Sequence, residues 1–409
     1  VRVGDRLEER PTTLRYSHHG PVLHQDTANH RAYALRAAWL EPGMAPYLGS
    51  IEYMRARNWD QFLAAMNRWG APSENQVYAD TSGNIGWKPG GLAPIRPNWD
   101  GLLPVPGDGR YEWQGFYDAD RLPVEYNPTR GWVATANQMN LPEGYPEKLG
   151  FEWAAPYRFE RIAEVLSQPN RKFSIEDMLD LQTDYKSQPA QRLLAVLALL
   201  NSQSVVTGEA VQPFELLNGW DASLEPDSAA AALFEIWWRR HLPGAVLELP
   251  STLGPTIVEA KDDLIRQVSR ERLLRICERS IRSGDPGMRA ALLTSLASAY
   301  AETGELLGDD SQKWQWGSLH TMQFDHPFAD ALPEDFRLRA RIGPLPRGGS
   351  GETVGNTNYN LETFRQRSGA SFRMVIDVGN WEGSIAMNSP GQSGIPGHRH
   401  YDDLFEQWA

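Results

Sequence analysis

The sequence predicts an α+β fold with a mostly helical insertion, and three observations support this prediction. Short β-prone runs dominate residues 1–158, and extended patterns return over residues 311–409. Between them, over residues 159–310, apolar side chains recur three and four positions apart, as in amphipathic helices. The order β, helix, β favours one interrupted α+β domain over separate domains. We therefore expect domain boundaries after residues 158 and 310.

Composition and charge limit the classes of function. The 409 residues are 41% hydrophobic and 22% charged, as in ordinary globular proteins. A net charge of −12 disfavours a nucleic-acid partner. The longest apolar run, Leu193–Leu200, is too short to span a bilayer. Because Cys277 is the only cysteine, disulfides within the chain and cysteine-rich zinc sites are excluded. The 15 Trp and 14 Tyr among 36 Gly and 29 Pro favour either an aromatic-lined cleft or a large aromatic core.

The first part contains one predicted helix among strands. Asn58 is a suitable helix cap, and apolar residues follow it at helical spacing. Residues 89–110 form a long loop rich in Pro and Gly, which we expect to be packed because it carries Trp99, Leu102, Leu103 and Val105. The predicted elements are extended runs at Leu14–Tyr16, His18–Leu23 and Arg31–Leu40, a helix over Asn58–Trp69, and a hairpin of Gln76–Asp80 with Asn84–Trp87.

The middle part is predicted to be helical and the last part extended. Ser174 is expected to cap a helix, since acidic residues follow it. Cys277 is expected to be a buried structural thiol. The helices are predicted at Phe159–Ser167, Ile175–Asp184, Gln191–Leu200, Ala229–His241 and within Thr256–Tyr300, with a break at Gly284–Gly287. In the last part, Ser371–Val378 and Gly383–Met387 indicate a hairpin, and Tyr401–Trp408 opens a helix.

One stretch, Gly131–Arg158, places polar side chains where a site could form. A β-prone run, Val133–Ala136, is followed by the amides Asn137 and Gln138, a loop, and Arg158 at a predicted helix start. Such an arrangement suits a polar site walled by aromatics. It also suits a turn asparagine and an arginine paired with a surface acid, since Asn is common in turns. The residues alone leave both interpretations open.

Common catalytic motifs are absent from the sequence. It contains no G-x-x-x-x-G-K-[ST], no H-E-x-x-H and no G-x-S-x-G. His320 and His326 could form a metal pair or be two unrelated core and loop histidines. The aspartates of the Pro/Gly loop region could bind calcium or be solvated loop acids; they are Asp100, Asp108, Asp118 and Asp120.

Several stretches, in order along nearly the whole chain, resemble the β-subunit of the penicillin acylase family of N-terminal nucleophile hydrolases. The matching segments are His19–Val22, Tyr78–Asp80, Gly83–Gly86, Leu103–Gly107, Tyr111–Phe116, Asn127–Pro128, Ala134–Asn137, Tyr157–Arg158, Trp314–Gly317, Gly369–Arg373, Pro390–Gly394 and His400–Tyr401. The resemblance implies a four-layer αββα sandwich, incomplete in this chain, with a helical insertion. It also implies hydrolysis of a linear amide by a serine freed through self-cleavage of a precursor.

The resemblance assigns roles to four residues. Asn137 matches the asparagine that donates to the oxyanion, and Arg158 matches the arginine that orients this asparagine and the catalytic amine. Phe151 matches an aromatic residue of the acyl pocket. Glu74 falls near a pocket position that is apolar in penicillin G enzymes, which puts a phenylacetyl preference in doubt. N-acyl-homoserine lactones, lipopeptides and glutaryl-cephalosporins are other substrates in the family, and the sequence does not separate them.

The nucleophile departs from the family pattern, because Val1 has no nucleophilic atom. We expect the chain to be a fragment, inactive alone, whose partners are an α-subunit and a missing N-terminal part of the β-subunit. The family needs no catalytic cofactor; it allows a structural calcium ion with ligands mostly outside this chain, and it implies a periplasmic or secreted location. Two alternatives remain: a non-catalytic fragment of the same fold that binds an acyl or aromatic ligand, and a metal-dependent hydrolase using His320 and His326.

Overall fold

The chain folds into two compact units, each described here by itself. Unit 1 comprises residues 1–135 and 139–153, and unit 2 comprises residues 136–138 and 154–409. The structure is a computed structural model, and the residues that it describes are 1–3, 6–43, 48–202, 206–249, 269–331 and 333–409.

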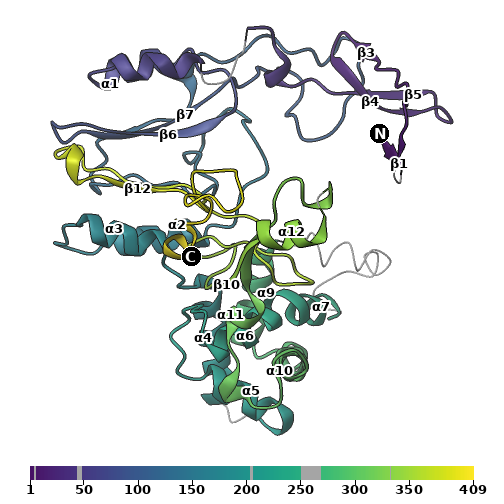
Figure 1. The fold of residues 1–409 in the computed structure, drawn as a ribbon, viewed down its shortest axis with the longest axis vertical. Coiled ribbons are helices and arrows are strands. Elements are labelled where there is room, and N and C mark those ends of the chain that lie inside the picture. The colour runs from purple at the N-terminus through teal and green to yellow at the C-terminus, as the bar shows by residue number, and fades with distance from the viewer. Residues whose placement is uncertain (4–5, 44–47, 203–205, 250–268, 332) are drawn as a thin grey trace. The chain divides into compact units, whose positions relative to one another are not determined.

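Unit 1 is built mainly from antiparallel strands (Figure 1). Its strands are β1 (Arg2–Val3), β2 (Arg6–Leu7), β3 (Tyr16–Ser17), β4 (Gly20–Asp26), β5 (Arg31–Ala34), β6 (Glu74–Ala79), β7 (Ile85–Gly90) and β8 (Glu125–Tyr126). Its one α-helix among the described residues is α1 (Trp59–Met66), and 3₁₀ turns cover Ala38–Leu40, Leu48–Arg55 and Ala119–Arg121.

The strands of unit 1 pair into two three-stranded sheets and one two-stranded ribbon. The sheets have the orders β3-β4-β5 and β6-β7-β8, and β1 pairs with β2. The predicted hairpin is confirmed, since β6 pairs with β7 from Glu74 opposite Gly90 to Ala79 opposite Ile85. Asn58 caps α1 as predicted, because its side-chain oxygen accepts from the Gln61 amide.

Two strand predictions were wrong in this part of the chain. The extended run expected over Arg31–Leu40 stops at Ala34, and Ala38–Leu40 turns into a 3₁₀ helix. The β-prone run Val133–Ala136 is not a strand, because no neighbouring segment pairs with it among the described residues. In both cases the side chains favour an extended backbone, but a strand also needs a hydrogen-bonding partner.

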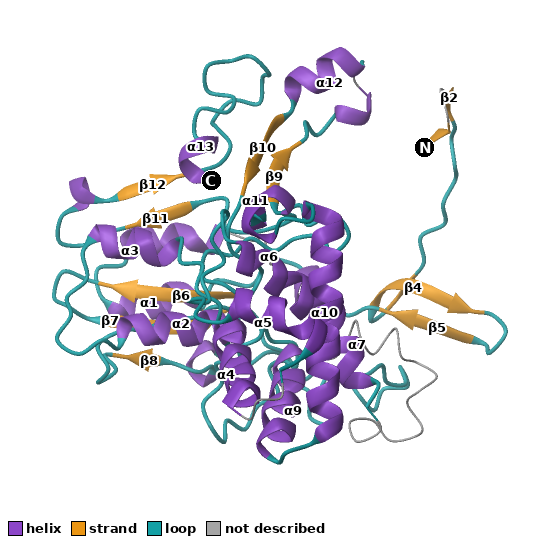
Figure 2. Ribbon diagram, turned by 90° about the horizontal axis from the view of Figure 1, so that it is seen from below, coloured by secondary structure: helices purple, strands orange, loops and turns teal. Residues whose placement is uncertain are grey.

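Unit 2 is mainly helical, with two short pairs of antiparallel strands (Figure 2). Its helices are α2 (Tyr157–Leu166), α3 (Ile175–Gln182), α4 (Gln188–Ser202), α5 (Val211–Leu217), α6 (Ala229–Ile236), α7 (Leu242–Leu247), α9 (Arg270–Arg282), α10 (Pro286–Leu307), α11 (Trp316–Leu319), α12 (Glu334–Ala340) and α13 (Phe405–Trp408). Its strands are β9 (Thr321–Phe324), β10 (Ile342–Pro346), β11 (Arg373–Val375) and β12 (Ile385–Met387), and 3₁₀ turns cover Gly208–Ala210, Ser311–Lys313, Ala329–Ala331 and Trp381–Gly383.

Most helix predictions in unit 2 are confirmed. Ser174 caps α3 through a reciprocal pair of hydrogen bonds with Asp177. The β11–β12 hairpin forms where it was expected, and Pro286 opens α10 after the predicted break. The single helix expected over Ala229–His241 is instead α6 followed by a π-helical turn at Trp237–His241. The expectation for residues 256–268 lies outside the described residues.

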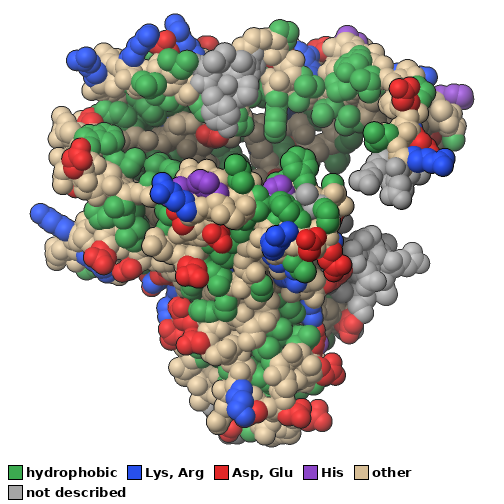
Figure 3. Space-filling model, in the orientation of Figure 1, with side chains coloured by type: hydrophobic (Ala, Val, Ile, Leu, Met, Phe, Trp, Pro, Cys, Tyr) green, Lys and Arg blue, Asp and Glu red, His purple; other side chains and the backbone are tan. Residues whose placement is uncertain are grey.

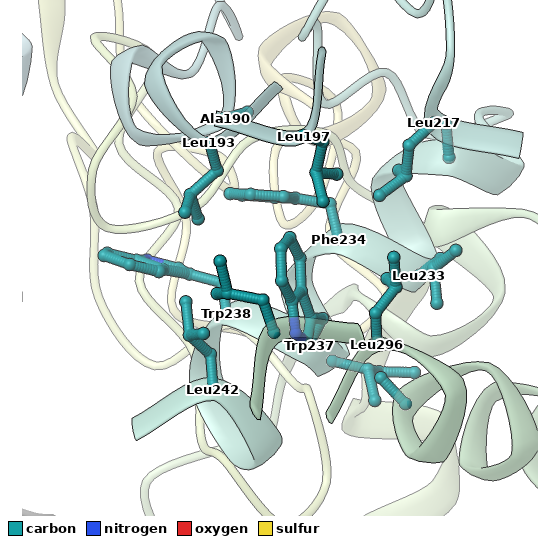
Figure 4. Close-up of a cluster of buried hydrophobic side chains, with 14 of the residues drawn as sticks. Ala190, Leu193, Leu197, Leu217, Leu233, Phe234, Trp237, Trp238, Leu242 and Leu296 are labelled. Atoms are coloured by element: carbon teal, nitrogen blue, oxygen red, sulfur yellow. The ribbon is translucent and has the colours of Figure 1, made fainter. Parts of the chain in front are cut away.

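A tryptophan-rich core holds unit 2 together. Trp237, Trp238 and Phe234 are fully buried against leucines of α4, and α10 closes the other side (Figure 4). Cys277 of α9 is buried in the same cluster, as predicted. Burying one Leu or Phe side chain of this core stabilises the fold by roughly 1.5–3 kcal/mol. Tyr157, the first residue of α2, also belongs to this core and is 1% exposed.

The described residues therefore give the predicted α+β class. No sheet formed by them has more than three strands. The exposed side chains mix both signs of charge with apolar groups on the face shown in Figure 3. Among the helices that the structure describes, none is long and apolar enough to cross a membrane.

Candidate active site

The site is built around Asn137, which lies in a turn of unit 2. Its backbone adopts the left-handed conformation with φ 65°, which Asn tolerates better than most residues. Two hydrogen bonds hold the turn: the Ala154 amide donates to the Asn137 carbonyl at 2.8 Å, and the Ala136 amide donates to the Gln138 side-chain oxygen at 2.7 Å. Gln138 also forms a parallel bridge with Ala154. The turn therefore has a fixed shape.

Arg158 reaches this turn from the first turn of α2. Its Nη2 donates to Asn137 Oδ1 at 3.0 Å. The position of the guanidinium follows from the core, because the preceding residue, Tyr157, is buried there and fixes the start of the helix. Burial lowers the pKa of Arg158 from its ordinary value, and such a group remains a cation at neutral pH.

This contact determines the orientation of the Asn137 amide. A guanidinium can only donate hydrogen bonds, so the amide oxygen must face Arg158 and the side-chain N–H₂ must face away. The Asn137 side chain is exposed, and its N–H₂ donates to no other group among the described residues. The pair therefore presents two oriented, unused N–H donors backed by a positive charge. Such a group can bind an oxyanion.

The other two predicted site residues lie in unit 1. Phe151 is 41% exposed, and Glu74 is exposed at the start of β6. Burial raises the pKa of Tyr53 to about 12, and the nearby charge of Glu74 adds to this. Tyr53 stacks on Phe62, with ring centroids 5.2 Å apart. The structure thus brings Asn137 and Arg158 together, and Glu74 lies near an aromatic cluster of its own unit.

Unit 1 also contains a hollow of about 570 Å³. Its lining combines apolar and aromatic side chains with two carboxylates and an arginine. The lining residues are Met66, Asn67, Trp69, Pro89, Gly90, Gly91, Leu92, Phe116, Tyr117, Asp118, Ala119, Asp120, Arg121 and Leu122. Its volume is that of a small-molecule pocket.

The histidines considered for a metal site are unsuited to one. His320 is fully buried, donates from Nδ1 to the Phe364 carbonyl, and stacks on Trp316. Burial lowers its pKa to about 4. Among the described residues, neither His320 nor His326 belongs to a group of three or more metal-ligating side chains whose ligand atoms converge.

Sequence reasoning missed the roles of Gln138 and Ala154. Gln138 was noticed as an amide, but its hydrogen bond to the Ala136 amide depends on the shape of the turn. Ala154 acts through its backbone alone, so its residue type carries no signal of this role.

The comparisons with known proteins identify the family. Residues 1–409, the whole chain, match the family described as penicillin amidase. The chain belongs to the penicillin amidase family. The chain is 31% identical over 388 residues to the acyl-homoserine lactone acylase QuiP of Pseudomonas fluorescens, covering 88% of this chain and 45% of that protein. It is 29% identical over 397 residues to the penicillin acylase 2 proenzyme of a Pseudomonas species, covering 96% of this chain and 50% of the proenzyme.

One solved structure shows the fold. A thermostable penicillin G acylase from Alcaligenes faecalis superposes with a TM-score of 0.71 at 21% identity, covering 100% of this chain and 76% of that one. This likeness confirms the predicted fold type, that of the N-terminal nucleophile hydrolases. The chain spans about half the length of the curated relatives it matches.

Proposed function

We propose that this penicillin amidase family chain is part of an amidohydrolase that cleaves the linear amide of an N-acylated substrate. The observation that carries the proposal is the Arg158–Asn137 contact, which leaves two oriented amide N–H donors unused. The names of the relatives agree with it, since they are acylases of acyl-homoserine lactones and penicillins. A β-lactam side chain, an N-acyl-homoserine lactone or a related acyl amide is the proposed substrate class.

The nucleophile in this proposal is an N-terminal serine outside this chain. Its α-amine titrates near neutral pH, at about 7.7–8.0, and can accept the proton of the hydroxyl on the same residue. Attack on the acyl carbonyl places a negative charge on oxygen, and the Asn137 N–H₂ donates to that oxygen. Collapse of the tetrahedral species, with the proton passing from the α-amine to the leaving nitrogen, releases the amine and leaves an acyl-serine, which water hydrolyses. This chemistry uses no cofactor.

Arg158 has a positioning role in the proposed mechanism. It holds the amide oxygen and thereby aims the N–H₂ at the oxyanion before the reaction begins. Donors fixed in advance need no reorganisation as the charge develops, which is why such groups contribute strongly to the rate. Phe151 and Glu74 are proposed to line the acyl pocket, where Glu74 disfavours a purely apolar acyl group at its position.

The proposal also covers the partners, location and metal content of this chain. The partners are an α-subunit and an N-terminal β-subunit segment that supply the serine and the second oxyanion donor. The 409-residue chain alone is then inactive. The proposed location is periplasmic or secreted, and the proposed structural calcium ion has its ligands mostly outside this chain. We also propose that the chain divides into three parts, with boundaries after residues 158 and 310.

The test is an Asn137→Ala substitution in the complete enzyme. We expect kcat for amide hydrolysis to fall by roughly 10²–10³-fold, the usual effect of removing one oxyanion donor. Asn170→Ala is the matched control, because Asn170 is also exposed and left-handed, with φ 60°. Both substitutions place Ala in the same strained backbone, so only Asn137→Ala should lose turnover. Near-normal kcat in Asn137→Ala would refute the proposed role.

A second candidate function is supported by the hollow in unit 1. Its volume and its aromatic lining suit an acyl or aromatic ligand, which a non-catalytic protein of this fold could bind. Turnover distinguishes the two functions. A complete protein that binds N-acyl amides but leaves them uncleaved would favour this candidate over the hydrolase.

A further inference from the structure

Three side chains of unit 1 converge far from the Asn137 turn in sequence. His18 and His19 form the turn between β3 and β4, and Glu112 lies two residues after the Pro/Gly-rich loop of residues 89–110. The Nε2 atom of His19 lies 2.6 Å from Glu112 Oε1, and that of His18 lies 3.5 Å from the same oxygen. Among the described residues, this is the one group of three whose potential metal-ligand atoms all lie within 4.8 Å of one another.

The backbone around the group fixes its shape. Gly20 follows the histidines with φ 131°, and a Cβ there would lie 2.1 Å from the Leu35 carbonyl oxygen. A Cβ at Gly107 would come within 3.2 Å of the His19 ring. Both glycines therefore permit close approaches that larger residues would hinder. The turn and the loop are held against each other with His19 between them.

Arg36 organises the carboxylate from the other side. Its Nη1 lies 3.4 Å from Glu112 Oε2, and its guanidinium lies 4.7 Å from the centre of the Trp113 ring. Oε2 thus faces a permanent cation, and Oε1 faces both imidazoles.

A simple ion pair accounts for only part of this geometry. One proton on His19 Nε2 satisfies the 2.6 Å contact with Glu112. It does not explain why the ring of His18, whose side chain is 70% exposed, lies beside the same oxygen with its centroid 3.7 Å from that of His19. When the ring protons lie on Nδ1, the two Nε2 atoms and the carboxylate oxygen offer three lone pairs to a single cation.

We propose that His18, His19 and Glu112 bind a divalent transition-metal ion, with Zn²⁺ the best match to two imidazoles and one carboxylate. Zinc takes nitrogen and oxygen ligands at about 2.0–2.2 Å in a tetrahedral arrangement, which separates ligand atoms by roughly 3.3 Å. The His18 contact already has nearly this spacing. The His19 contact must lengthen by less than about 1 Å, as the ion takes the lone pair of Nε2 and the single proton of the neutral ring lies on Nδ1.

The proposed ion would join the β3–β4 turn to a loop 93 residues further along the chain. The exposed side of the group leaves the fourth coordination position to water. Arg36 acts on the outer oxygen of the ligating carboxylate, a second-layer contact typical of metal sites. This site belongs to unit 1 and the Asn137–Arg158 pair to unit 2, so amide hydrolysis is not its readout.

The experiment is a competition titration of the purified protein with Zn²⁺ against a chromophoric chelator. We expect one Zn²⁺ per chain, with the dissociation constant raised at least tenfold in both His18→Ala and Glu112→Gln. The control is His24→Ala, which removes an exposed imidazole of β4 outside the group and should bind as the parent does. Co²⁺ in place of Zn²⁺ should give the visible absorption of a tetrahedral complex, which His18→Ala should abolish.

Thermal unfolding with and without Zn²⁺ distinguishes a variant that has lost metal binding from one that has lost its fold. Zn²⁺ should raise the melting temperature of the parent and of His24→Ala but not that of His18→Ala, whose metal-free melting should equal the parent's because His18 is exposed. Unchanged Zn²⁺ affinity in both His18→Ala and Glu112→Gln would overturn the proposal. Absence of stoichiometric binding in the parent would also overturn it and leave a hydrogen-bonded His–Glu pair.

Discussion

At the scale of single residues, the site depends on which way one amide faces. Asn137 contributes an oxygen to Arg158 and keeps its nitrogen free, since the guanidinium has no acceptor to offer. The left-handed backbone at Asn137 and the hydrogen bond from the Ala154 amide fix the base of that side chain. The orientation therefore follows from the turn and from the arginine together.

Arg158→Gln should weaken catalysis by loosening this orientation. A charge-assisted hydrogen bond contributes about 1.5–3 kcal/mol, so we expect kcat in the complete enzyme to fall roughly 10–100-fold. KM should change little, because Arg158 acts through Asn137. Arg171→Gln is the control, since Arg171 forms its contacts with Gln168 and Asp177 away from the turn. A rise in KM at unchanged kcat would instead place Arg158 in substrate binding.

The sequence could predict Asn137 and Arg158 only through the resemblance to a family. Their residue types alone also allowed a turn asparagine and a surface arginine. The structure shows that Asn137 is indeed in a turn, and that Arg158 contacts it instead of a surface acid. The contact joins residues 21 positions apart, and no local pattern encodes the path of the loop between them.

Among the elements, α2 carries Arg158, the proposed positioning residue, and is itself anchored. Arg161, one turn after Arg158, donates through Nε and Nη2 to Asp184 Oδ2 at 2.9 and 2.7 Å. Asp184 follows α3, so the pair fixes α2 against the end of the next helix. Both side chains are more than four-fifths buried, which protects the pair from screening by solvent.

Asp184→Asn should destabilise unit 2 by about 2 kcal/mol, because it removes a partly buried ionic hydrogen bond to Arg161. Chemical denaturation followed by tryptophan fluorescence measures this change. Asp335→Asn is the control, since its ion pair with Arg339 is largely exposed and should contribute less than about 1 kcal/mol. Equal effects of the two substitutions would show that Asp184 does not anchor α2.

Elements with a local signal were predicted well, and elements that depend on a partner were not. The caps at Asn58 and Ser174 lie where the sequence predicts, because a cap uses residues three positions apart. The run Val133–Ala136 has strand-forming residues but remains unpaired with any strand among the described residues. The π-helical turn at Trp237–His241 also had no signal, because helical periodicity does not distinguish it from an α-helix.

At the scale of the whole molecule, buried titratable groups make unit 2 sensitive to pH. Burial, with the charge of Glu352 in support, raises the pKa of Glu235 to about 7. Tyr359 donates its hydroxyl proton to the Glu235 carboxyl in the same buried cluster. His320, by contrast, has its pKa lowered to about 4 by burial. Glu235 therefore reduces folding stability as the pH rises, and His320 reduces it as the pH falls.

The contribution of Glu235 to folding stability depends on pH, because its pKa differs between the folded and unfolded states. Its folded pKa lies above its unfolded value of 4.5, so its stabilisation is complete below pH 4.5 and is lost as pH rises through about 7. The loss reaches about 3 kcal/mol at alkaline pH. His320 has a lowered pKa, so its contribution is present above pH 6.5 and is lost as pH falls toward 4.

Glu235→Gln should therefore flatten the alkaline side of the stability profile, since Gln carries no charge to bury. The measurement is the melting temperature at pH 6 and pH 8. The melting temperature of the parent should fall more between pH 6 and pH 8 than that of Glu235→Gln. The variant should also have the higher melting temperature at pH 8. An equal loss in both proteins would contradict the raised pKa of Glu235.

The proposed mechanism requires Asn137 to be an oxyanion donor and not only a turn residue. Asn137→Asp in the complete enzyme tests it most directly, because Asp keeps the oxygen that Arg158 binds but replaces the N–H₂ donor with a second oxygen. We expect the melting temperature of Asn137→Asp to equal or exceed the parent's, and kcat for amide hydrolysis to fall by roughly 10²–10³-fold. A folded Asn137→Asp enzyme that turns over at the parent's rate would contradict it.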